Sequence, residues 1–188
     1  RGVSSYESSE IGGMAHLVNF MGSDTLAALV AARRHYHEPC AAFSIPAAEH
    51  ATITAWGRPQ EGDAFANMLT HFAKPGGLLA VVSDSYDVFH AVSELWGERL
   101  RQQVMDSGAT VVIRPDSGEP VQVVAEVIDR LAAAFGTTLN SKGYRVLNHV
   151  RVIQGDGVNL ASIDAILSRL AKLGYSADNV AFGMGAEL

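Results

Sequence analysis

Short apolar runs alternate with stretches of helical spacing along most of this chain, and that alternation limits the folds it can adopt. Between the runs, apolar residues recur as on one face of a helix within residues 24–36, 63–72, 86–105, 121–135 and 160–173. The six runs that have the length and composition of strands are residues 16–20, 42–45, 79–83, 110–114, 150–154 and 179–183. Repeated strand–helix units predict an α/β fold with right-handed connections and a parallel sheet.

The number of strands leaves two architectures open. A closed β/α barrel normally takes about eight strands, whereas about six are visible here, which would suit an open doubly wound sheet. Glycine turns, however, follow the last strands and not the first, and barrels commonly bind phosphate after their final strands. We therefore favour part of an irregular parallel β/α barrel and keep the open sheet as the alternative.

No linker or change of composition divides the chain, so we expect residues 1–188 to form a single domain. Its first residue is Arg1 and not methionine, which favours the central portion of a longer barrel, truncated at both ends. The least regular stretch, residues 136–149, is expected to be a surface excursion between two strand–helix units.

Charge and hydropathy exclude several classes of protein. The net charge of −6 provides no broad positive surface for nucleic acid. No stretch approaches the roughly 20 apolar residues that a membrane span requires. The single cysteine, Cys40, rules out a disulfide within the chain and a zinc site of several cysteines. We expect a cytoplasmic protein that binds neither nucleic acid nor membrane.

A histidine and two carboxylates follow three successive predicted strands. His50 comes after the second strand, and Asp84 and Asp116 come after the next two. In parallel sheets these strand ends lie on one edge, where ligands bind. A neutral imidazole is a nucleophile and proton acceptor, especially when a carboxylate fixes its tautomer. We predict catalytic roles for all three residues, although a histidine bonded to backbone at a helix start is the alternative for His50.

Further polar and glycine residues at this edge are suited to a phosphorylated sugar. Arg114 ends the fourth run, where it either pairs with Asp84 or Asp116 or grips a substrate oxygen. Asp116 can accept hydrogen bonds from ribose hydroxyls. Glycine turns at residues 155–157 and 183–185 follow the last two runs and allow backbone amides to approach a phosphate. These residues predict an enzyme that acts on a phosphorylated sugar.

Two further residues are candidates for substrate contacts near the start of the chain. Asp24 begins a predicted helix, where it either caps the helix or accepts a hydrogen bond from a ligand amide. A carboxylate in that place would also repel a negatively charged analogue of the ligand. Arg1 can contact a phosphate.

Eight motifs resemble the nicotinamide phosphoribosyltransferases of the type II phosphoribosyltransferase family. They occur in order along essentially the whole chain, and several are long and unusual. The motifs are Arg-Gly-Val-Ser-Ser (1–5), Ala-His-Leu-Val-Asn-Phe (15–20), Pro-Ala-Ala-Glu-His (46–50), Thr-Ile-Thr-Ala-Trp-Gly (52–57), Val-Ser-Asp-Ser-Tyr-Asp (82–87), Ile-Arg-Pro-Asp-Ser-Gly (113–118), Asn-Ser-Lys-Gly-Tyr (140–144) and Arg-Val-Ile-Gln-Gly-Asp-Gly-Val (151–158).

The resemblance implies an irregular α/β barrel with its active site at a homodimer interface. It also implies a pentosyl transfer in NAD salvage, in which nicotinamide and phosphoribosyl pyrophosphate give nicotinamide mononucleotide and pyrophosphate, with Mg²⁺ as cofactor. His50 matches the family's histidine that ATP, a co-substrate, transiently phosphorylates. Asp84 and Asp116 match the carboxylates that orient this histidine.

The remaining matches are substrate contacts, and no residue is assigned as a metal ligand. Asp24 matches a contact to the nicotinamide carboxamide, Arg114 a substrate-binding arginine and Arg1 a pyrophosphate contact. Asp116, Gly155 and Asp156 match contacts to the ribose phosphate. The family often has three glycines in the last turn, whereas this chain has Gly185, Ala186 and Glu187. We expect the amides of Gly185 and Ala186 to face phosphate, although alanine restricts the backbone.

Two other functions stay open. One is the nicotinate branch of the same fold, which the predicted contact of Asp24 with an amide disfavours. The other is a noncatalytic fragment that keeps the fold without a complete site. The family's nicotinamide-stacking aromatic residue would lie before Arg1, and further basic phosphate ligands would lie after Leu188. We therefore expect this stretch by itself to lack full activity.

Overall fold

The computed structural model describes residues 3–23 and 25–183. Their contacts divide them into two compact units, one up to Ile45 and the other from Pro46 to Gly183, and each unit is described by itself. The single domain expected for residues 1–188 stays a prediction. Among the described residues, no helix combines the length and the apolar character needed to cross a membrane.

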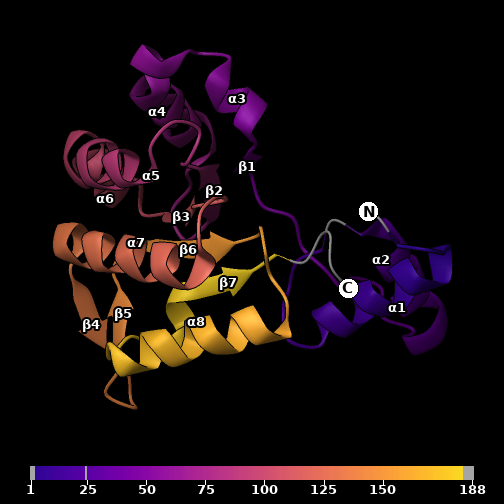
Figure 1. Cartoon of the computed structure of the whole chain (residues 1–188). Helices are drawn as coiled ribbons and strands as arrows, with labels where there is room; N and C mark the ends of the chain where they lie inside the picture. Colours follow the sequence, from indigo (N-terminus) through magenta and orange to yellow (C-terminus); the bar gives the residue numbers. More distant parts are fainter. Residues whose placement is uncertain (1–2, 24, 184–188) are drawn as a thin grey trace. The chain divides into compact units, whose positions relative to one another are not determined.

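A parallel five-stranded sheet forms the centre of the larger unit (Figure 1). Its strands lie in the order β1-β2-β3-β6-β7, and adjacent strands are parallel throughout. The strands are β1 (Ala47–Ala48), β2 (Leu78–Val82), β3 (Thr110–Arg114), β6 (Val150–Gln154) and β7 (Val180–Phe182). Because this order follows the chain without the reversal of a doubly wound sheet, it is consistent with part of a β/α barrel.

Helices connect the strands of the larger unit, as the alternation of the sequence predicts. In Figure 1, α7 and α8 lie side by side next to β6 and β7. The helical segments are α3 (His50–Thr54), η1 (Arg58–Gln60), α4 (Glu61–Phe72), α5 (Val88–His90), η2 (Ala91–Arg99), α6 (Arg101–Ser107), α7 (Pro120–Phe135), α8 (Leu160–Lys172) and η3 (Ala177–Asn179). The helical pattern predicted over residues 86–105 is confirmed, but the middle of this segment, η2, is a π-helix between two short α-helices.

Helix α7 shows how the sequence directs the packing against the sheet. Glu119 caps its first turn by accepting a hydrogen bond from the Gln122 amide at 2.8 Å. Val124, Ile128 and Leu131 follow at helical intervals, and their side chains are fully buried. The buried stripe packs beside β6, whereas the opposite face of the helix is polar. The strand ends are therefore held by a well-packed core.

Residues 136–149, predicted as an irregular surface excursion, form an ordered hairpin instead. Its antiparallel strands are β4 (Thr137–Leu139) and β5 (Arg145–Leu147). The side chain of Asn140 shapes the connecting turn, because its oxygen accepts hydrogen bonds from the amides of Lys142 and Tyr144, each at 3.0 Å. The hairpin begins where α7 ends, so it precedes β6 without joining the parallel sheet.

The smaller unit contains α1 (Tyr6–Leu17) and α2 (Leu26–Tyr36), which pack against each other. The strand predicted at residues 16–20 is wrong: this run ends α1 and turns, which stacks the ring of His16 on that of Phe20 with centroids 4.5 Å apart. The strand predicted at residues 42–45 is also wrong. Phe43 makes only an isolated bridge to Gly22, and the first strand of the sheet comes later, at β1.

Candidate functional site

The carboxyl ends of the parallel strands bring the predicted reactive residues to one edge of the sheet. Glu49 and His50 follow β1, and Asp84 lies two residues after β2. Arg114 is the last residue of β3, and Asp116 follows it. Gly155 and Asp156 come directly after β6, while Gly183 follows β7. Since neighbouring strands are parallel and in register, these groups share an edge although they are up to about 130 residues apart in sequence.

His50 and Asp84 form a hydrogen bond across two neighbouring strands. The distance from Nε2 of His50 to Oδ1 of Asp84 is 2.8 Å. The Asp84 side chain is only 3% exposed, whereas that of His50 is 45% exposed. An ionised carboxylate only accepts hydrogen bonds, so this pairing places the imidazole proton on Nε2 and leaves the lone pair of Nδ1 as the basic one. The pair therefore presents an oriented, accessible imidazole.

Arg114 is paired within the protein, mainly with Glu49. Its guanidinium donates two hydrogen bonds to the Glu49 carboxylate, at 3.0 and 2.8 Å, and lies 3.4 Å from Oδ2 of Asp116. The hydrogen bond with Glu49 raises the pKa of Arg114, and the charges of Asp116 and Asp84 add to this effect while burial opposes it. Its Nε atom is buried without a hydrogen-bond partner among the described residues. This donor is therefore unsatisfied, but it is not exposed to solvent.

Asp116 lies in the most strongly charged part of the edge. Burial raises the pKa of its carboxyl above the ordinary range, and the Arg114 guanidinium opposes this rise. Asp84 and Asp156 raise the pKa further, whereas His50 lowers it. All four groups are thus within electrostatic reach of Asp116. The carboxyl is poised to accept hydrogen bonds, since its side chain is still 21% exposed.

The turn after β6 approaches both Asp116 and the end of β7. A Cβ atom added at Gly155 would lie 3.1 Å from Oδ1 of Asp116, and one at Gly183 would lie 3.4 Å from Cα of Gly155. The buried Gln154 side chain holds the turn by donating a hydrogen bond to the Asp156 carbonyl at 2.7 Å. Asp156 itself is exposed. Small residues therefore keep the backbone of this edge open to a ligand.

Four candidate residues, Arg1, Asp24, Gly185 and Ala186, lie outside the described residues. Two contributors that the sequence reasoning missed lie within them. Glu49 was visible in the motif before His50, but nothing in the sequence indicated that it pairs with Arg114. Gln154 is 1% exposed. The only sign in the sequence that it supports the site was its position at the end of a buried strand, directly before a glycine turn. The expected roles of the individual site residues remain predictions.

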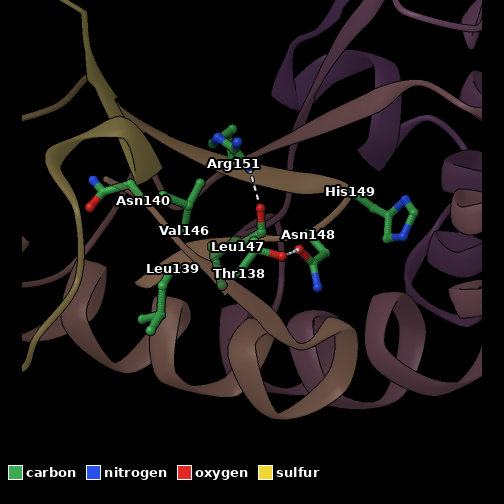
Figure 2. Close-up of a pocket in the computed structure, with 8 residues that line it drawn as sticks. All are labelled: Thr138, Leu139, Asn140, Val146, Leu147, Asn148, His149 and Arg151. Atoms are coloured by element: carbon green, nitrogen blue, oxygen red, sulfur yellow. Dashed lines mark hydrogen bonds between the residues drawn. The ribbon is translucent and has the colours of Figure 1, made fainter. Parts of the chain in front are cut away.

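A separate cavity lies beside the hairpin and not at this charged edge (Figure 2). Its volume is about 460 Å³, and residues 138–140, 146–149 and Arg151 line it. The guanidinium of Arg151 donates hydrogen bonds to the carbonyls of Leu147 and Val150. His149 and Arg151 belong to the amino end of β6, the end opposite Gly155. We place the candidate site at the carboxyl edge, because the imidazole and its carboxylates are there.

The described residues contain no cluster of three or more histidine, cysteine or acidic side chains that could hold a metal ion. Mg²⁺ does not need such a cluster, since it commonly binds one or two carboxylates and completes its shell with water and substrate phosphates. The carboxylates of Asp116 and Asp156 supply oxygens of the required type at the edge where a phosphate would bind. The residues present therefore fit Mg²⁺ held jointly with a substrate.

Comparison with known proteins gives one consistent family. The model of the Nicotinate phosphoribosyltransferase (NAPRTase) family matches residues 1–188. A nicotinamide phosphoribosyltransferase of Xanthomonas campestris pv. campestris (strain 8004) is 63% identical over 188 residues, which are all of this chain and 40% of that relative. Proteins of the same name from Mycoplasma pneumoniae and Acinetobacter baylyi are 34% and 30% identical over 99% of this chain, which covers 42% and 41% of their lengths. The chain thus spans about two fifths of each of these relatives.

Proposed function

Because this chain belongs to the Nicotinate phosphoribosyltransferase (NAPRTase) family, we propose that it carries much of the catalytic edge of a nicotinamide phosphoribosyltransferase. The reaction joins nicotinamide to the phosphoribosyl group of phosphoribosyl pyrophosphate. The pyridine nitrogen of nicotinamide forms a bond to C1 of the ribose, the bond from C1 to the pyrophosphate oxygen breaks, and pyrophosphate leaves. The products are nicotinamide mononucleotide, an intermediate of NAD salvage, and pyrophosphate.

The observation that carries this proposal is the hydrogen bond of 2.8 Å between the accessible His50 and the buried Asp84. It supports a reactive imidazole at the edge that also holds Arg114 and Asp116. In the proposed site Asp116 and Asp156 accept hydrogen bonds from the ribose hydroxyls, and the amide of Gly155 faces the sugar phosphate. Arg114 would turn part of its guanidinium from Glu49 to a substrate oxygen. Mg²⁺ would neutralise pyrophosphate charge between these carboxylates and the substrate.

ATP couples to this reaction through His50 in our proposal. The Nδ1 lone pair attacks the γ-phosphorus of ATP, a nitrogen–phosphorus bond forms, the bond from that phosphorus to the bridging oxygen breaks, and ADP leaves. The proton stays on Nε2, which donates its hydrogen bond to Asp84, and this carboxylate stabilises the positive charge that develops on the imidazole. Hydrolysis of the phosphohistidine returns His50 to its starting state. The buried position of Asp84 strengthens this interaction, because little water screens the carboxylate.

Labelling with ATP tests this step directly. Full-length protein incubated with γ-labelled ATP should carry acid-labile phosphate, and His50→Ala should abolish both the label and the stimulation of turnover by ATP. His71→Ala is the matched control, since His71 is an exposed histidine on α4. Persistent labelling of His50→Ala, or equal loss in His71→Ala, would contradict the assignment.

Nicotinate is the second candidate substrate, because the family description names it whereas the relatives reported above are named for nicotinamide. We propose nicotinamide, with Asp24 as the residue that accepts a hydrogen bond from the amide. A carboxylate there would repel the carboxylate of nicotinate. Parallel assays of full-length protein with the two pyridines, each measured as pyrophosphate release, distinguish them. Faster turnover of nicotinate would refute this part of the proposal.

The setting of the enzyme is also proposed from the family resemblance. We infer a homodimer in the cytoplasm, with an active site shared between subunits. Sedimentation of the full-length protein tests the dimer. Mixing two inactive variants, each defective in a different part of the site, tests the sharing: recovered activity supports a shared site, and no recovery in a proven mixed dimer refutes it.

A further inference from the structure

A buried hydrogen-bond cluster lies directly behind the Asp84 carboxylate. The side chain of Trp96 donates from Nε1 to Oγ of Ser83 at 3.0 Å, and that hydroxyl donates to the carbonyl of Val81 at 3.0 Å. The amide of Ser83 donates to the carbonyl of Arg114 at 2.9 Å. Ser83 and Trp96 are both fully buried. Ser83, the residue immediately before Asp84, is therefore held by three hydrogen bonds: one to η2, one to β3 and one to β2, the strand that it follows.

The indole that makes this contact has little freedom to move. Its ring stacks on that of Phe65 from α4, with centroids 4.6 Å apart and planes inclined by 11°. The next residue, Gly97, is tightly packed, because a Cβ atom there would lie 3.0 Å from the carbonyl oxygen of Val92 and 3.2 Å from the side chain of Ala134 on α7. The Trp96 side chain, which comes from η2, is thus held between Phe65 of α4 and Ser83 at the end of β2.

The helix that carries Trp96 is the π-helix η2, Ala91–Arg99. Such helices are rare, and they are found frequently at functional sites. Here Trp96 of this helix reaches Ser83 at the end of β2, one peptide away from Asp84. The unusual helix and the candidate site thus meet at Ser83.

We propose that Trp96, acting through Ser83, is a positioning residue that holds the Asp84 carboxylate in line with Nε2 of His50. This inference rests on the proposed function, in which that imidazole reacts. Because the backbone before Asp84 is held in place, the buried Asp84 carboxylate determines the orientation of the exposed His50 imidazole. We call the hydrogen bond from Trp96 to Ser83 the clamp. Its loss lets the Ser83–Asp84 peptide tilt, and a small tilt lengthens the 2.8 Å hydrogen bond between His50 and Asp84 enough to weaken it.

Ser83→Ala tests the clamp in the full-length protein, because it removes the hydroxyl and keeps the backbone. With ATP present, we expect kcat for nicotinamide mononucleotide formation to fall about tenfold and KM for nicotinamide to be unchanged, since misplacement of the imidazole that reacts with ATP costs rate. Leu170→Ala is the matched control: it removes a buried side chain from α8 and leaves Phe65, Trp96 and Ser83 unchanged. It should lower the melting temperature and leave kcat within about twofold of the wild type.

A second readout does not depend on the reaction. The imidazole nitrogen NMR shifts of His50, assigned by comparison with His50→Ala, report its hydrogen bond to Asp84. They should move in Ser83→Ala and stay in place in Leu170→Ala. Replacing Trp96 by β-(3-benzothienyl)alanine, in which sulfur stands in for the indole N–H, provides the same test if Ser83→Ala does not fold.

The outcomes separate the two proposals. A wild-type protein that forms no nicotinamide mononucleotide refutes the proposed function, and the shifts of His50 still decide the clamp. Unchanged shifts and unchanged kcat in Ser83→Ala overturn the clamp while the function stands. Equal losses of kcat in Ser83→Ala and Leu170→Ala, in proportion to their losses of stability, show a purely structural role and also overturn it.

Discussion

Replacing Gly155 by alanine should impair sugar-phosphate binding by pushing the Asp116 carboxylate out of place. The added methyl group would lie 3.1 Å from Oδ1 of Asp116, about 0.3 Å closer than an ordinary contact. Gly155 does not have a positive φ angle, so alanine fits its backbone without strain. The substitution therefore isolates a steric effect on a single side chain.

The size of the effect follows from the freedom of that side chain. Overpacking by one methyl group typically costs about 1–3 kcal/mol, and the lower end applies here because the Asp116 side chain is 21% exposed and can turn toward solvent. In the proposed site, this rotation would break the alignment of the Asp116 carboxylate with the ribose. We expect a loss of about 1 kcal/mol in binding, or about fivefold in Kd for phosphoribosyl pyrophosphate. The melting temperature should change little.

Calorimetric titration of the full-length protein with phosphoribosyl pyrophosphate measures this loss. Gly183→Ala is the control, since its methyl group would meet Cα of Gly155 at an ordinary contact distance of 3.4 Å. A double-mutant cycle with Asp116→Ala tests the cause. If the methyl group acts through the carboxylate, Gly155→Ala should have little further effect once Asp116 is alanine. An equal cost in both backgrounds, or an equal cost in Gly183→Ala, would refute the reasoning.

Two further substitutions test the electrostatics of the fold. Glu61, at the start of α4, is 3% exposed, and burial raises the pKa of its carboxyl above the ordinary value of 4.5. The free energy of unfolding therefore falls as pH rises from 4.5 through the pKa of the folded state. Glu61→Gln should raise the melting temperature at pH 7 and leave it unchanged below about pH 4. A higher melting temperature at every pH would contradict this. Arg114→Lys keeps the charge but loses the two hydrogen bonds to the largely exposed Glu49, so the free energy of unfolding in denaturant should fall by under about 1 kcal/mol. Turnover should fall by a much larger factor than this loss of stability accounts for. A loss of turnover as small as the loss of stability would show that Arg114 has a structural role only.

The sequence predicts the buried strands of this fold most reliably. The predicted bounds of β3 and β6 agree with the structure, because strands covered on both faces consist of nearly continuous hydrophobic residues. The run at residues 16–20 has the same composition, yet Val18 is 80% exposed and the segment ends a helix. Local composition cannot reveal this difference, because it depends on what packs against the run.

Other features depend on contacts between distant residues. Arg114 and Glu49 are 65 positions apart, and the sequence offered Asp84 and Asp116 as equally plausible partners. The π-helix was also hidden, since Val92 and Trp96 keep a four-residue spacing that an α-helix would show as well. What could be predicted was the edge at which the reactive residues gather, because strand direction alone determines it.

The charge of that edge has a consequence for substrate binding. Its described side chains include the carboxylates of Glu49, Asp84, Asp116 and Asp156, against the guanidinium of Arg114 and the imidazole of His50. Such an edge is suited to ribose hydroxyls and to an oriented imidazole, but its carboxylates repel a pyrophosphate. In the proposed reaction the pyrophosphate would therefore need further positive charge, of which Mg²⁺ would supply a part. Pyrophosphate affinity should accordingly fall steeply when Mg²⁺ is removed, whereas the bond between His50 and Asp84 needs no metal to form.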